Sequence, residues 1–282
     1  MTQQLLKPNT RRRDSSEPLP PVQRSYRIPS APESDALSPP TVPTQSIYLS
    51  VILPTYKERT NLLGMVTALS YLLDEVLPNA YELIVVDDNS PDQTWNVALQ
   101  LIHHYPALRV IRRMEERGLA TAVVRGWEAA QGEILGVIDT DLQQPPEVLL
   151  ELVKRMQQGA DLAIASRNAQ GGGSRNLSPA RRLLRFGARL LGRLILPNVV
   201  GRVSDPMSGY FLVRREAIAG RVLFPSGYKI LLEVLSRGDI QNIAEVGYVF
   251  HGRPDKRKHS FGSKVIGYLR HLMQLRQSLE TL

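Results

Sequence analysis

The sequence predicts an α/β domain in which a mostly parallel β-sheet is covered by helices on both faces. Short apolar runs alternate with longer segments whose apolar residues recur at helical spacing, and the connections between them are short. This alternation is typical of consecutive βαβ units, whose right-handed crossovers place the carboxyl ends of the strands at one edge of the sheet. With 282 residues and 43% hydrophobic content, the chain is long enough to bury such a core.

The alternating series begins after a proline-rich tail. Residues 1–46 contain nine prolines, an Arg11-Arg12-Arg13 run and few large apolar residues, so we expect a disordered, extended tail. Strands are expected at 48–53, 82–86, 109–112, 134–138 and 162–165. Helices are expected between them at 58–77, 93–104, 119–130 and 147–157.

Basic residues are concentrated in two stretches near the end of the chain. Residues 175–202 hold seven arginines and no acidic residue, and residues 251–282 hold seven lysines and arginines against two acidic residues. This concentration predicts an anionic surface or a phosphate-bearing ligand at both stretches.

A basic amphipathic helix is expected at 178–197. Arginines recur there every four residues from Arg181 to Arg193, and leucines occupy another face. Helices of this kind lie in a bilayer interface, and the alternative is an ordinary helix packed on the sheet with a solvated arginine stripe. A second amphipathic stretch, at 265–275, follows it.

Composition excludes several classes of protein and site. The chain has no cysteine, which excludes disulfides and thiolate metal ligands. It has no run of 18 apolar residues, so we expect no transmembrane helix within it. A pI of about 9.8 raises the possibility of nucleic-acid binding, but the basic stretches lack interleaved aromatic residues, so we expect no nucleic-acid partner.

Polar residues gather where the expected strands end. Asp139-Thr140-Asp141-Leu142-Gln143 follows the central strand, at the edge where open α/β sheets bind their ligands. Two carboxylates and an amide oxygen suit Mg²⁺ or Mn²⁺, which keeps open positions for substrate phosphates. We therefore predict Asp139, Asp141 and Gln143 as metal ligands. Asp87 and Asp88 follow the second strand, where they can serve a ligand or cap a turn and helix.

Eight stretches of the chain, in order, resemble the inverting GT-A glycosyltransferases of family 2. The resemblance is closest to the dolichol-phosphate mannosyltransferase, or polyprenyl-phosphate hexosyltransferase, branch. The matching stretches are 52–59, 85–92, 116–119, 139–143, 166–167, 205–210, 227–233 and 262–264. The resemblance implies the GT-A fold of nucleotide-diphospho-sugar transferases, with C-terminal amphipathic helices added to it.

The resemblance also implies roles for individual residues. A nucleoside pocket and a donor diphosphate site would be formed by Pro54, Tyr56, Glu58, Asp87, Asp139, Asp141, Gln143, Arg253 and Lys264. The acceptor phosphate would be bound by Arg167 and Arg181, and the implied catalytic residues are Asp141, Arg167 and Arg253. Residues 254–259 make the place of Arg253 uncertain, so Arg257 or Lys258 is an alternative donor contact. Lys57 stands where the family usually has asparagine, and Leu177 where relatives often carry tryptophan.

The implied reaction is inverting transfer of a hexose from a nucleotide sugar to dolichyl or polyprenyl phosphate. Mannose from GDP-mannose is the first expectation, and a UDP-glucose-dependent glucosyltransferase is the alternative. A lipid phosphate is an anion near neutral pH and can attack without a base, whereas transfer to a sugar hydroxyl needs one. A soluble family 2 transferase acting on a glycan or protein is therefore a rival, with Asp205 as its candidate base.

The expected organisation has three parts. Residues 1–46 form the tail, residues 47–250 the GT-A catalytic domain, and residues 251–282 a basic segment near acceptor and membrane. We expect a peripheral protein at the cytoplasmic face of a membrane. Relatives in this branch often continue into transmembrane helices, so a membrane partner subunit or a transmembrane region after residue 282 stays open as a partner.

Overall fold

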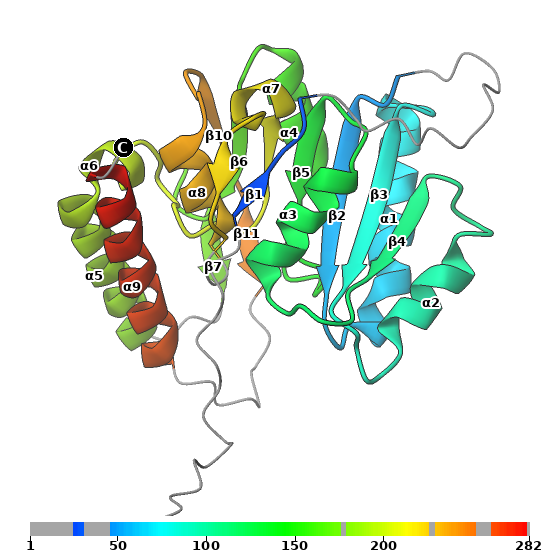
Figure 1. Ribbon diagram of the computed structural model, residues 1–282, viewed down its shortest axis with the longest axis horizontal. Coiled ribbons are helices and arrows are strands. Elements are labelled where there is room, and N and C mark those ends of the chain that lie inside the picture. The colour runs from blue at the N-terminus through cyan, green and yellow to red at the C-terminus, as the bar shows by residue number, and fades with distance from the viewer. Residues whose placement is uncertain (1–24, 31–45, 176–178, 226–228, 252–260, 281–282) are drawn as a thin grey trace, which may run out of the picture.

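A central seven-stranded sheet with helices on both faces organises the protein (Figure 1). The structure is a computed structural model that describes residues 25–30, 46–175, 179–225, 229–251 and 261–280. The strand order is β10-β6-β8-β5-β2-β3-β4. Its strands are β2 Leu49–Thr55, β3 Tyr81–Asp87, β4 Leu108–Arg112, β5 Ile134–Val137, β6 Leu162–Ser166, β8 Phe211–Arg214 and β10 Ile243–Gly247. The predicted α/β class is confirmed.

Helices cover the two faces of this sheet with separate apolar clusters. Helices α1 (Arg59–Val76), α2 (Thr94–Leu101) and α4 (Val148–Gln157) pack on one face, and α3 (Leu119–Ala129) packs on the other. Helix α1 buries Leu62, Met65, Val66, Leu69 and Leu73, which recur at helical spacing along one side of it. The periodicity in the sequence therefore predicted this helix and the face that it buries.

Strand β8 is the antiparallel member of the sheet and was not predicted. It lies between β5 and β6 and runs antiparallel to both, whereas β2 pairs in parallel with β3 and β5. The close approach depends on Gly136, because a Cβ atom there would lie 2.6 Å from the side chain of Leu212. Insertion of β8 brings the residues that precede it, 205–210, to the edge where β5 and β6 end.

A short N-terminal segment also belongs to the fold. Strand β1 (Tyr26–Arg27) pairs antiparallel with β9 (Val222–Leu223), and the adjoining Ile28 is completely buried. The backbone N–H of Gly220 donates to the carbonyl of Ile28 at 2.9 Å. The expectation of a disordered tail over 1–46 is therefore wrong for residues 25–30, because one apolar side chain and a strand pair anchor them. Residues 1–24 and 31–45 lie outside the described part.

Two helices lie side by side at one end of the molecule (Figure 1). They are α5 (Pro179–Ile195) and α9 (Phe261–Glu280). The remaining described elements are β7 (Gly173–Arg175), α6 (Pro197–Val200), α7 (Arg215–Ile218), α8 (Ile230–Arg237) and β11 (Val249–His251). Helix α9 buries Tyr268, Leu272 and Leu275 in the same cluster as α3, so it is part of the domain core. Of the helices that the structure describes, none has the length and apolar character needed to cross a bilayer.

Candidate active site

The two carboxylates predicted to bind metal follow β5 directly, at the carboxyl edge of the sheet. Burial raises the pKa of Asp139 to about 6, and the negative charge of Asp141 adds to this effect. Lys229 and Arg167 oppose it by stabilising the charged form. Two carboxylates held together against solvation and mutual repulsion form a site that a divalent cation would stabilise. Among the described residues, histidine, cysteine and acidic side chains form no group of three or more that could hold a metal ion, and Gln143 stays a predicted ligand.

A strained loop carries these residues. Leu142 has φ 58°, in the left-handed region that bulky side chains rarely adopt, and it separates Asp141 from Gln143. The N–H of Gln143 donates to Asp141 Oδ1 at 3.1 Å. The carbonyl of Gln143 accepts a hydrogen bond from the N–H of His251 in β11 at 3.0 Å. The strain is thus maintained by contacts on both sides of the loop, as is common where backbone geometry serves a site.

Gln144 is a positioning residue that the sequence did not reveal. Its side chain is buried, its Nε2 donates to Asp139 Oδ2 at 3.3 Å, and its Oε1 accepts from the N–H of Asp139 at 3.3 Å. These two contacts fix the orientation of the first carboxylate. Gln144 lies immediately after the recognised motif, and no spacing rule marks it.

The residues predicted to line the nucleoside pocket come from the end of β2. Thr140 donates from Oγ1 to the carbonyl of Pro54 at 3.2 Å, which joins this strand end to the predicted metal site. The ring of Tyr56 is 44% exposed, and the guanidinium of Arg117 lies 5.7 Å from its centre. The charge of Glu58 contributes to the raised pKa of Asp139, so these residues lie around one site.

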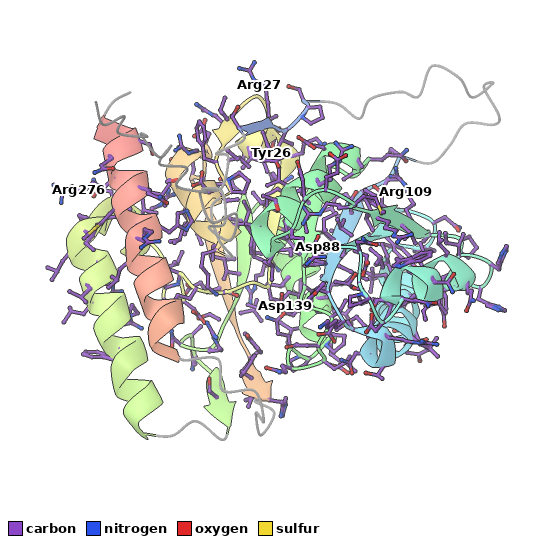
Figure 2. All side chains as sticks on the ribbon, turned by 60° about the horizontal axis from the view of Figure 1, so that its bottom comes forward. Tyr26, Arg27, Asp88, Arg109, Asp139 and Arg276 are labelled. Carbon is purple, nitrogen blue, oxygen red and sulfur yellow. The ribbon has the colours of Figure 1, made fainter. Side chains whose placement is uncertain are left out.

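Asp87 and Asp88 both have structural contacts. Asp87 is completely buried and accepts hydrogen bonds from Thr55 Oγ1 at 2.9 Å, Ser90 Oγ at 2.6 Å and the Ser90 N–H at 2.8 Å. Asp88 accepts from Arg113 and from the N–H of Gly118 at 2.7 Å. The first carboxylate holds the turn after β3, and the second fixes the loop that leads to α3. Asp88 and Asp139 both lie near the middle of the molecule (Figure 2).

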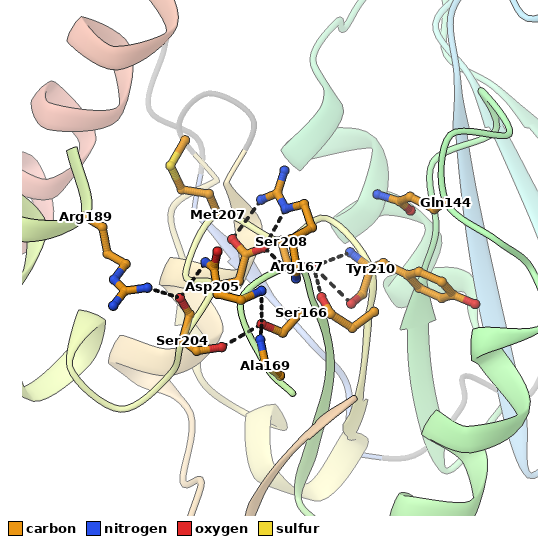
Figure 3. A network of polar contacts seen from close by, with 12 residues as sticks. Gln144, Ser166, Arg167, Ala169, Arg189, Ser204, Asp205, Met207, Ser208 and Tyr210 are labelled. Atoms are coloured by element: carbon orange, nitrogen blue, oxygen red, sulfur yellow. Dashed lines mark hydrogen bonds and ion pairs between the residues drawn. The ribbon is translucent and has the colours of Figure 1, made fainter. Parts of the chain in front are cut away.

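Arg167, at the end of β6, forms a two-bond ion pair with Asp205 (Figure 3). Its Nε donates to Oδ2 at 2.6 Å and its Nη2 donates to Oδ1 at 2.7 Å. Burial would raise the pKa of Asp205, but the hydrogen bonds and charge of Arg167 outweigh burial and hold this pKa below its usual range. A carboxylate in this state is a poor proton acceptor, which removes the physical basis for Asp205 as a general base.

Lys229 is a second functional candidate that the sequence analysis did not single out. Its Nζ donates to the carbonyl of Met207 at 2.7 Å, and its charge lowers the pKa of both Asp139 and Asp205. The 205–210 segment lies against the predicted metal site at Gly209, where a Cβ atom would come within 3.3 Å of Asp139 Oδ2. Lys229 lies within the stretch 227–233 that contributed to the resemblance, which was the signal available for it.

Comparison with known proteins places this geometry in a family. Residues 50–220 match the family model described as glycosyl transferase family 2. The chain belongs to glycosyltransferase family 2. The dolichol-phosphate mannosyltransferase of Pyrococcus furiosus is 41% identical over 80% of this chain. The chain spans 63% of the length of that relative, which is less than two thirds. The dolichol-phosphate mannosyltransferase of Saccharomyces cerevisiae is 33% identical, with 82% of this chain and 87% of the relative covered.

Solved structures of more distant proteins show the same fold. Glucosyl-3-phosphoglycerate synthase from Mycobacterium tuberculosis, in complex with Mn²⁺, uridine diphosphate and phosphoglyceric acid, gives a TM-score of 0.62 at 22% identity, covering 82% of this chain and 78% of that one. A mannosyltransferase from Pyrobaculum calidifontis, in complex with GDP-Man and Mn²⁺, gives 0.57 at 20% identity, covering 83% and 64%. The predicted GT-A fold is confirmed.

Several residues that the sequence analysis named fall outside the described part of this chain. Arg253, Arg257, Lys258 and Leu177 lie in segments that the structure does not describe. The backbones of Arg181 and Lys264 belong to α5 and α9, but their side chains are not among those described. The roles of these residues stay predictions.

Proposed function

We propose that this family 2 glycosyltransferase moves mannose from GDP-mannose to dolichyl or polyprenyl phosphate. The observation that carries the proposal is the state of Asp205. Its carboxylate is bound by Arg167 and its pKa is lowered, so the site offers no base at this position. An acceptor that arrives as an anion needs no base. The names of the relatives at 41% and 33% identity support the same acceptor and sugar.

The proposed step forms one bond and breaks one bond. An oxygen of the acceptor phosphate attacks the anomeric carbon of the sugar, and the bond from that carbon to the donor diphosphate breaks with inversion. The nucleoside diphosphate leaves with the electron pair, and no proton has to move. Arg167 would bind the attacking phosphate, because a guanidinium can contact phosphate oxygens while its other edge pairs with Asp205.

The donor diphosphate would lie over the carboxylates that follow β5. Asp139, Asp141 and Gln143 would hold Mg²⁺ or Mn²⁺ there, and the raised pKa of Asp139 fits a carboxylate pair that a cation completes. The metal, when bound, would neutralise the diphosphate of the leaving group. Lys229 is placed to add a second positive charge, since its field reaches Asp139 and Asp205. Pro54, Tyr56, Glu58 and Asp87 would form or support the nucleoside pocket.

A membrane surface is the proposed location of the acceptor. Helix α5 exposes a ridge of four apolar side chains, Phe186 (62%), Leu190 (51%), Leu191 (45%) and Leu194 (71%). Seven arginines and no acidic residue occur in the sequence around this ridge, at 175–202. An exposed apolar ridge within a basic segment fits the anionic cytoplasmic leaflet of a membrane. The protein would be peripheral, with docking by α5.

A lipid-extraction assay tests the proposed reaction. Purified protein is incubated with labelled GDP-mannose or UDP-glucose, Mg²⁺ or Mn²⁺, and polyprenyl phosphate, and the organic phase is counted. We expect label from GDP-mannose in the lipid phase and none when the uncharged polyprenol replaces its phosphate. Label from UDP-glucose alone would identify the glucosyltransferase instead. Transfer to a glycan or protein, without transfer to lipid phosphate, would contradict the proposal.

A further inference from the structure

Ser204 connects three elements of the fold beside the Arg167–Asp205 pair (Figure 3). Its hydroxyl lies 2.6 Å from that of Ser166 at the end of β6, and its N–H donates to Glu245 Oε1 of β10 at 2.6 Å. Its carbonyl accepts from Asn168 Nδ2 at 2.8 Å and from Arg189 Nη1 of α5 at 3.3 Å. The next residue along the chain is Asp205, so the place of Ser204 sets the place of the ion pair.

Arg189 differs from the apolar residues of α5 in what its side chain contacts. It is half-buried and bonds to Ser204, whereas Phe186, Leu190 and Leu194 are exposed. Helix α5 packs on α9 and α6, and Gly192 allows the close approach to α9, because a Cβ atom there would overlap the Tyr268 hydroxyl. Helix α5 therefore faces outward with an apolar ridge and inward with an arginine bound to the segment that holds Asp205.

We propose that Arg189 is a positioning residue: when α5 binds a lipid surface, Arg189 fixes the position of the Arg167–Asp205 pair. The inference deepens the proposed function and rests on it, since the acceptor is taken to be a lipid phosphate. A helix held by a surface moves less, and its arginine then fixes the Ser204 carbonyl. The phosphate-binding edge of Arg167 is thereby set when the protein is at the membrane, where the acceptor lies.

Two single variants separate this link from simple charge attraction. Arg189→Gln and Arg193→Gln each remove one positive charge from α5, so both weaken attraction to an anionic surface by a similar amount. Arg193 is exposed one turn further along the helix, whereas Arg189 bonds to Ser204. A difference between the variants at saturating lipid therefore reports on the Ser204 contact.

Hydrogen exchange provides a readout that needs no turnover. Amides of residues 202–210 are followed with and without saturating vesicles of phosphatidylcholine, phosphatidylglycerol and polyprenyl phosphate. We expect vesicles to slow exchange in the wild type and in Arg193→Gln, but not in Arg189→Gln. The same protection in Arg189→Gln, or no protection in the wild type, would overturn the link. A protein that shows the expected pattern and transfers no mannose would disprove the proposed function alone.

Acceptor kinetics give a second readout. Arg189→Gln should raise the KM for polyprenyl phosphate about tenfold relative to Arg193→Gln, the loss expected for one hydrogen bond from a charged group. The affinity for GDP-mannose, measured by calorimetry, should not change. Equal acceptor KM values in the two variants would refute the proposal. If Arg189→Gln does not melt cooperatively, Arg189→Lys takes its place. It keeps the charge with a poorer fit to the carbonyl, so its acceptor KM should still exceed that of Arg193→Gln.

Discussion

Three non-glycine residues that follow central strands have left-handed backbone angles. They are Lys57 after β2 (φ 63°), Asn89 after β3 (φ 52°) and Leu142 after β5 (φ 58°). Asparagine tolerates this region because its short side chain bonds locally, whereas lysine and leucine lose about 1–2 kcal/mol there. The strain lies at the edge of the sheet where the candidate site residues gather. At Lys57 it fits the asparagine that the family resemblance implies for this position.

Replacing Lys57 by asparagine should stabilise the protein. The change relieves left-handed strain while the backbone N–H keeps its bond to Ser90 Oγ at 3.0 Å. We expect the free energy of unfolding, measured with urea, to rise by about 1 kcal/mol. Lys57→Ala is the control, because alanine also loses the cation 5.3 Å from the Tyr56 ring but still carries a strained Cβ. Equal stability of the two variants would show that the strain is not the cause.

Asp139→Asn should raise the stability of the metal-free protein and abolish metal binding. Burial raises the pKa of Asp139 from its ordinary 3.8 to about 6, so its ionised form costs folding free energy above that pH. Without metal, the variant should melt at a higher temperature than the wild type above pH 6. The difference should shrink as pH falls below about 6 and vanish below the ordinary pKa of 3.8, where the wild-type carboxyl is protonated in both states.

The same variant should lose the response to Mn²⁺ and all transfer. Wild-type affinity for Mn²⁺ should rise with pH through about 6 and then level off, because only the ionised carboxyl binds metal. Glu75→Gln, an exposed carboxylate change on α1, is the control and should keep the Mn²⁺-induced rise in melting temperature. Retention of that rise by Asp139→Asn would remove Asp139 from the metal site.

At the scale of elements, local pattern predicted five of the six parallel strands of the sheet, and β10, which pairs in parallel with β6, was not predicted. Segments such as β2 and β3 are apolar, short and bounded by helices with clear periodicity. Their own residues are therefore enough to identify them as strands. The position of β8 cannot be predicted from its own residues, because its antiparallel pairing depends on the chain passing back between β5 and β6. The same limit hid Lys229, which reaches the site from the start of α8 only because of that topology.

The pairing of β1 with β9 leads to a test of an unexpected element. Ile28→Ala should lower the free energy of unfolding by about 2–5 kcal/mol, because it removes a completely buried side chain from the core. Arg27→Ala is the control, since Arg27 is exposed in the same segment (Figure 2) and should cost little. Chemical denaturation measures both. Equal, small losses would mean that residues 25–30 do not pack on the domain in solution.

At the scale of the whole molecule, the sheet edge carries the residues proposed to bind the donor and acceptor phosphates, and the α5–α9 pair carries the proposed membrane contact. The carboxyl ends of β2, β3 and β5 gather the residues proposed for the donor, and the end of β6 holds Arg167. The 205–210 segment lies between them, tied to β6 through Asp205, to α8 through Lys229 and to the predicted metal site at Gly209. Because Arg189 of α5 bonds to Ser204, which directly precedes this segment, the helix proposed to contact the membrane adjoins the proposed acceptor site.

Membrane association should have a salt-sensitive and a salt-resistant part. Each basic residue near an anionic leaflet contributes about 1 kcal/mol that salt screens, whereas burial of the apolar ridge of α5 is not screened. Flotation with anionic vesicles should therefore show binding that falls at high salt without vanishing. Leu190→Gln with Leu194→Gln should abolish the residual binding, since both leucines are more than half exposed. Leu63→Gln with Leu99→Gln, at 52% and 45% exposure on α1 and α2, is the matched control and should bind as the wild type does. Equal loss in both double variants would place the contact elsewhere.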